Sequence, residues 1–137
     1  MEQRLDILLL DDEPIVGKRL GPALAKIGCQ VEVFEDPRKA VARLDEKNFD
    51  IVVTDMRMDE IDGLQVLEHA LARSPRTRVI MITGYAMMSL AREAMDKGAF
   101  DFIAKPFTPD DLRRVIAKAA EALGSKVDFS LAAETGA

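Results

Sequence analysis

Five short apolar runs alternate along this chain with segments of helical period, and this alternation limits the possible folds more than any other feature. The runs occupy residues 5–10, 31–34, 51–54, 79–83 and 100–104. They are nearly continuous in apolar residues, which is typical of parallel strands that are covered on both faces. Strands that alternate with helices build an open, doubly wound parallel sheet. The sequence therefore predicts an α/β fold with helices on both faces of the sheet.

Helix start and stop signals fill the intervals between the runs. Asp36 and Thr108 each precede a proline and are placed as N-caps, and Pro14 suits a first helical turn. Gly28 and Gly98 are placed to end helices. We expect helices over residues 14–27, 37–44, 63–73, 86–97 and 110–123.

The first of these helices contains residues that weaken helical structure. Gly17, Gly21 and Pro22 lie inside it, and an interior proline can lower helix stability by up to ~3 kcal/mol. Leu20 and Leu24 nevertheless recur at helical spacing. We expect the helix to persist, with a bend or a loss of stability at Pro22.

The composition describes one acidic domain. With 137 residues, 48% of them hydrophobic, the chain can bury a core without disulfides. We expect this domain over residues 1–123 and a flexible tail, or the start of a linker, over 124–137. The single cysteine, Cys29, fits the cytoplasm and is expected to be a small buried residue. The net charge of −5 disfavours direct nucleic-acid binding, and no apolar run approaches the ~18 residues of a membrane span.

Polar residues with related chemistry follow four of the apolar runs. Asp11 and Asp12 follow the first run, Asp55 follows the third, Thr83 ends the fourth and Lys105 follows the fifth. Ligands of open parallel sheets bind beyond the carboxyl ends of the strands, so these side chains should meet at one edge. Each alone has a simpler interpretation, as a helix cap, a turn or a solvated lysine. Their conjunction favours a functional site.

Several carboxylates in one crevice repel each other, and a divalent cation with oxygen ligands would offset this repulsion. The positive charge of Lys105 and the hydroxyl of Thr83 suit a phosphoryl group. Asp55 would then be the nucleophile and form an aspartyl phosphate. The residue types therefore indicate metal-assisted phosphoryl transfer to a carboxylate.

Over residues 4–123 the sequence resembles the receiver domain of bacterial two-component response regulators. The resemblance is carried by "ILLLDDE", "DIVVTDMRM", the pair Asp62-Gly63, "VIMITGYA" and "GAFDFIAKPF". It implies a flavodoxin-like strand order of 2-1-3-4-5. It also implies that Asp55 accepts the phosphoryl group and that Thr83 and Lys105 contact that group.

The resemblance further implies a Mg²⁺ site and a set of modulating residues. The metal ligands would be Asp12, Asp55 and the backbone carbonyl of Arg57, with Asp11 acting through water. The resemblance also implies that Phe102 is a mobile aromatic residue, and that Arg57 and Tyr85 lie near the path of attacking water. It further implies a cis peptide bond between Lys105 and Pro106. One departure is Asp59, which stands where the family usually has a proline.

The sequence is compatible with three functions. A phosphorylation switch would receive its phosphoryl group from a sensor histidine kinase or phosphotransfer protein, and would change its surface over residues 86–123 to bind a partner or dimerise. A metal-dependent aspartyl-phosphate hydrolase needs a second aspartate two residues after the nucleophile, where this chain has Arg57. A phosphate-independent binding module would have lost some of the acids, the threonine or the lysine, which are all present. The switch is the favoured interpretation.

Overall fold

The computed structural model describes residues 5–26, 28–56, 62–84 and 88–125. The strands are β1 (Asp6–Leu10), β2 (Gln30–Phe34), β3 (Ile51–Asp55), β4 (Arg78–Thr83) and β5 (Asp101–Ala104). They form one sheet in the order β2-β1-β3-β4-β5, and every neighbouring pair is parallel. The helices are α1 (Pro14–Lys26), α2 (Pro37–Glu46), α3 (Gly63–Arg73), α4 (Met88–Asp96) and α5 (Pro109–Ala122). The expected fold class and strand order are confirmed.

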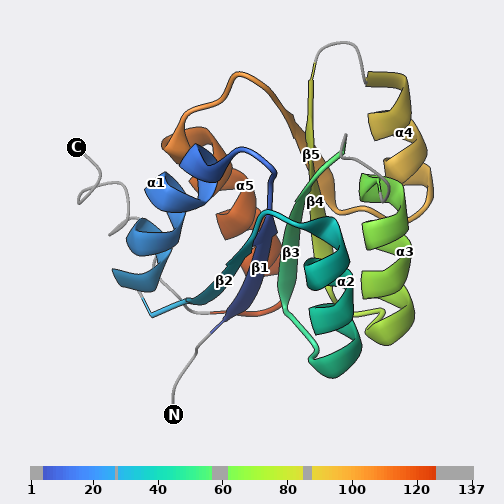
Figure 1. Ribbon diagram of the computed structural model, residues 1–137, viewed down its shortest axis with the longest axis horizontal. Coiled ribbons are helices and arrows are strands. Elements are labelled where there is room, and N and C mark those ends of the chain that lie inside the picture. The colour runs from blue at the N-terminus through green and yellow to red at the C-terminus, as the bar shows by residue number, and fades with distance from the viewer. Residues whose placement is uncertain (1–4, 27, 57–61, 85–87, 126–137) are drawn as a thin grey trace.

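Helices cover both faces of the sheet, with α1 and α5 on one side and α2, α3 and α4 on the other (Figure 1). Alternate strand residues enter the two cores. In β1, Ile7 and Leu9 pack with the α1 and α5 side, whereas Leu8 and Leu10 pack with the other. Because the residues on both faces of the strand are buried, its sequence is a continuous apolar run and not an alternation of apolar and polar residues.

The helix caps form as the sequence predicts. Asp36 accepts a hydrogen bond from the backbone N of Arg38 at 2.9 Å. Thr108 and Asp111 form a reciprocal capping box, with distances of 3.0 and 2.9 Å between side-chain oxygen and backbone nitrogen. Gly98 follows α4 with a φ of +109°, a conformation that favours glycine. Local signals therefore locate the ends of these helices.

Helix α1 persists through Pro22, as expected. Gly17 within this helix has a packing role that the sequence pattern does not reveal. A Cβ on Gly17 would lie 2.3 Å from Cγ1 of Val33 in the edge strand β2. The glycine thus permits an approach between helix and strand that alanine would prevent.

Cys29 is buried, as expected, and burial raises the pKa of its thiol to about 11. Within the described ranges, no helix is long and apolar enough to cross a membrane.

Candidate phosphoryl and cation site

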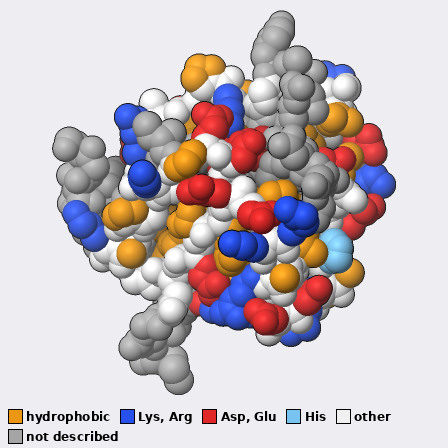
Figure 2. All heavy atoms as spheres, in the orientation of Figure 1, with side chains coloured by type: hydrophobic (Ala, Val, Ile, Leu, Met, Phe, Trp, Pro, Cys, Tyr) orange, Lys and Arg blue, Asp and Glu red, His pale blue; other side chains and the backbone are white. Residues whose placement is uncertain are grey.

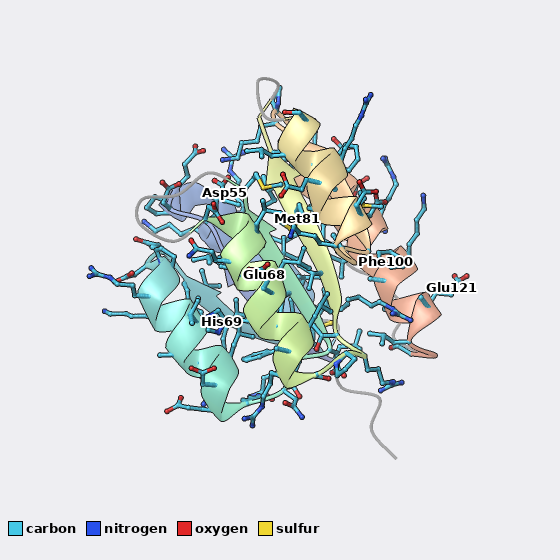
Figure 3. The ribbon with its side chains drawn as sticks, turned by 90° about the vertical axis from the view of Figure 1, so that its right-hand side faces the viewer. Asp55, Glu68, His69, Met81, Phe100 and Glu121 are labelled. Atoms are coloured by element: carbon cyan, nitrogen blue, oxygen red, sulfur yellow. The ribbon has the colours of Figure 1, made fainter. Side chains whose placement is uncertain are left out.

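The register of the sheet brings two acids side by side. Leu10 of β1 pairs with Thr54 of β3, so Asp11 and Asp55 follow directly from paired positions. The strand order reverses between β1 and β3, which is where ligands of such sheets bind. Figure 3 shows Asp55 at the carboxyl end of its strand, whereas His69 lies further along α3 and away from it.

Four carboxylates converge at this point. One oxygen from each of Asp11, Asp12, Glu13 and Asp55 lies within 4.8 Å of the others. Asp11 and Asp55 are buried, with exposed fractions of 3% and 6%, whereas Asp12 and Glu13 are exposed. In Figure 2 acidic side chains gather near the upper centre of the face shown, around the carboxyl ends of the strands. The expected acidic cluster is present.

Asp11 shows that the cluster suits a cation. Its Oδ1 accepts a hydrogen bond from the backbone N of Glu13 at 2.8 Å, while its buried Oδ2 has no hydrogen-bond partner among the described residues. Burial raises the pKa of Asp11 to about 6, the hydrogen bond from Glu13 opposes this rise, and the charge of Asp55 adds to it. A hard divalent cation would satisfy the orphaned oxygen and offset the repulsion. The oxygen donors therefore fit Mg²⁺.

Lys105 supplies the positive charge at the same edge. Its Nζ donates hydrogen bonds to Glu13 and, at 3.2 Å, to Oδ2 of Asp55, and it lies 3.5 Å from Oδ2 of Asp11. Burial lowers the pKa of Lys105, but the hydrogen bond to Glu13 and the charges of Asp11 and Asp55 outweigh burial and raise it overall. The ammonium is therefore charged at neutral pH. The Lys105-Pro106 bond is cis, as expected.

Thr83 and Phe102 lie on the neighbouring strands. Thr83 is buried at the end of β4, where its hydroxyl donates to the carbonyl of Gly84 at 3.1 Å and its own carbonyl accepts from the backbone N of Lys105 at 2.8 Å. Phe102 is partly buried in β5, beside Met81 of β4. The expectations for Arg57, Asp59, Tyr85 and residues 126–137 fall outside the described residues.

Three contributors to the site were missed by the sequence interpretation. Glu13 is a partner of Lys105, and its signal was its place directly after Asp11 and Asp12. The sequence pattern places Thr54 only at the end of an apolar run, but its buried hydroxyl donates to the Asp55 carbonyl at 3.1 Å. Gly63 packs against that same carbonyl, because a Cβ there would lie 2.7 Å from the oxygen.

The fold and the site together define an open parallel α/β protein with an acidic site, bordered by Lys105, where its strand order reverses. Residues 7–117 match the family model of the response regulator receiver domain. The chain belongs to this family, whose members are signalling modules of two-component systems.

Individual relatives agree with this assignment. The chain is 35% identical to the regulatory protein AtoC of Escherichia coli over 123 residues. This alignment covers 90% of the chain and 27% of AtoC. It is 34% identical over 116 residues to the response regulator protein PilR of Pseudomonas aeruginosa, covering 85% of this chain and 26% of PilR. The chain thus spans about a quarter of the length of the curated relatives it matches.

Solved structures show the same fold. A CheY-like response regulator receiver domain protein from Methanospirillum hungatei aligns with a TM-score of 0.81 at 26% identity, over 88% of this chain and 96% of that one. NtrX from Brucella abortus aligns with a TM-score of 0.79 at 30% identity, over 88% of this chain and 28% of NtrX.

Proposed function

We propose that the chain is a phosphorylation switch that accepts a phosphoryl group on Asp55 from a sensor histidine kinase or a phosphotransfer protein. The observation that carries this proposal is the convergence of Asp11, Asp12 and Asp55 with Lys105 at one edge of the sheet. An acceptor carboxylate, a set of cation ligands and a cation for the phosphoryl oxygens are the parts that such a transfer needs.

Asp11, Asp12 and Asp55 are the described residues that would hold Mg²⁺, and the resemblance adds the backbone carbonyl of Arg57. When bound, the metal supplies positive charge beside the transferred phosphoryl group. A carboxylate oxygen of Asp55 forms a bond to phosphorus while the bond from phosphorus to the donor breaks, and the donor leaves with the electron pair. Lys105 pairs with the phosphoryl oxygens, and Thr83 turns its hydroxyl from Gly84 to donate to one of them.

The product is a signal, because the phosphoryl group stays on the protein until water removes it slowly. Phosphorylation adds charge and acceptor oxygens at Asp55, which draws Thr83 inward and frees space for Phe102. We infer that the surface of α4, β5 and α5 then binds a partner or a second copy of the chain. The relatives AtoC, a regulatory protein, and PilR, a response regulator, support a role in regulation.

The direct test is phosphorylation of the full chain by acetyl phosphate, with the intact mass measured with and without Mg²⁺. We expect one phosphoryl adduct on the wild type that requires Mg²⁺, and none on Asp55→Asn. Asp45→Asn is the matched control, because it removes the same charge from an exposed side chain of α2. An adduct that persists on Asp55→Asn, or forms equally well in chelator, would contradict the proposal.

A further inference from the structure

Glu13 stands at the rim of the acidic site with its backbone fixed and its carboxylate exposed. Its backbone N donates to buried Asp11 at 2.8 Å, and the next residue begins α1. From this anchored position the side chain, which is 58% exposed, reaches across to accept a hydrogen bond from Lys105. The contact joins residues that are 92 positions apart in the sequence.

Three acids share the single ammonium of Lys105. Its contact with Glu13 is shorter than those with Asp55 and Asp11, which lie at 3.2 and 3.5 Å. Asp55 and Asp11 belong to the proposed acceptor and cation ligands. Glu13 belongs to the same carboxylate cluster but is assigned neither role. Its hydrogen bond with Lys105 therefore competes with the pairing of the lysine to the phosphoryl group.

We propose that Glu13 slows the phosphorylation of Asp55, because it pairs with Lys105 in the unphosphorylated protein. We call this effect a brake. This proposal rests on the proposed function, because Lys105 must leave Glu13 to pair with the phosphoryl oxygens. A charge-assisted hydrogen bond is about twice as strong as a neutral one, so its loss opposes the transfer. Glu13 is therefore a positioning residue that acts through Lys105.

The pair also lies at the edge of an open space. Glu13 and Lys105 both line a cavity of about 420 Å³ between α1 and the start of α5. Its other walls are largely apolar and include Leu20, Phe107 and Leu112.

Two substitutions separate the contact from the charge. Glu13→Gln removes the charge but keeps an oxygen that can accept a weaker bond. Glu13→Asp keeps the charge but is one methylene shorter, which withdraws the carboxylate from Lys105. If the contact is the brake, both variants should be phosphorylated faster than the wild type, by about threefold to tenfold for Glu13→Gln.

The experiment uses the full chain at saturating Mg²⁺ and measures the initial rate of adduct formation from acetyl phosphate by intact mass. A second readout is the dissociation constant of beryllofluoride, a phosphoryl mimic, which should fall by a similar factor because binding requires the same exchange at Lys105. Glu46→Gln is the matched control, since it removes one charge from an exposed ion pair with Arg43, on α2. Its rate and beryllofluoride affinity should equal those of the wild type.

Each outcome decides the proposal. Faster phosphorylation and tighter beryllofluoride binding in both Glu13 variants support the brake. An unchanged or slower Glu13→Gln overturns it, and so does a Glu13→Asp variant that matches the wild type, because charge alone would then explain the effect. If the wild type takes up no phosphoryl group, both the proposed function and the proposed role of Glu13 are wrong. If the wild type is phosphorylated and the Glu13 variants behave like it, only the proposed role of Glu13 is wrong.

Discussion

Asp11 illustrates the conflict between stability and function at the scale of one residue. Its carboxylate is 3% exposed, and burial raises its pKa from 3.8 to about 6. A raised acid pKa means that the folded chain favours the protonated form, so the ionised form destabilises the fold above about pH 6. This destabilisation is relieved as the pH falls from about 6 to about 4. Each pKa unit corresponds to about 1.4 kcal/mol.

Asp11→Asn should therefore stabilise the metal-free protein by about 1–3 kcal/mol at pH 8, because it removes a buried charge beside Asp55. Urea unfolding of the two proteins, in chelator, measures the difference. The gain should shrink at pH 4 and in saturating Mg²⁺, which stabilises the wild type. Asp45→Asn, at an exposed position, should change stability by less than about 0.5 kcal/mol. Equal stability of Asp11→Asn and the wild type at pH 8 would show that the buried charge carries no such penalty.

At the scale of elements, the contact between α3 and the end of β3 holds Asp55, the proposed acceptor, in place. Gly63, the first residue of α3, donates its backbone N to the carbonyl of Met56 at 3.0 Å. A Cβ at this position would lie 2.7 Å from the carbonyl oxygen of Asp55 and 2.8 Å from Cα of Met56. Both are backbone atoms, so the helix and the strand would have to separate.

Gly63→Ala should lower the free energy of unfolding by about 2 kcal/mol and slow phosphorylation of Asp55, because the displaced backbone carries the acceptor. Chemical denaturation and the acetyl phosphate assay measure the two effects. Gly84→Ala is the control for stability, because a Cβ there would meet no atom within 4 Å. Variants of equal stability would show that the contact at Gly63 relaxes without strain.

At the scale of the whole molecule, one core joins β4 and β5 to α4. Phe102 is partly buried beside Met81 on the side of the sheet that α4 covers. Thr83 ends the same strand as Met81 and is fully buried. A change at Thr83 therefore bears directly on the packing of β4 against β5, and a bias of a few kcal/mol between two packings is enough for a switch.

We expect beryllofluoride with Mg²⁺ to shift backbone amide NMR signals across α4, β5 and α5, that is, over residues 88–122. Helix α2 (residues 37–46) is the internal reference and should shift little, because it packs elsewhere on the sheet. Mg²⁺ alone and the Asp55→Asn variant are the controls and should leave residues 88–122 unchanged. Shifts confined to Asp11, Asp12, Asp55 and their immediate neighbours would contradict the proposed readout.

The sequence by itself determined the kinds of elements, their order and the chemistry at the strand ends. These depend on local physics: apolar runs, capping residues such as Asp36 and Thr108, and glycines such as Gly98 at helix ends. The acids and Lys105 could be predicted as one site because the carboxyl ends of parallel strands always share an edge. The family resemblance then supplied the strand order and the cis bond.

Only the tertiary structure decided which charged side chains are buried and which of them pair. Asp11 and Asp12 are adjacent in sequence, yet Asp11 is buried and its pKa is raised, whereas Asp12 is exposed. The pairing of Glu13 with Lys105 depends on how the start of α1 meets the end of β5, and no local pattern contains that distance. Desolvation and ion pairing are set by what packs around a side chain, and packing exists only once the sheet and its helices have come together.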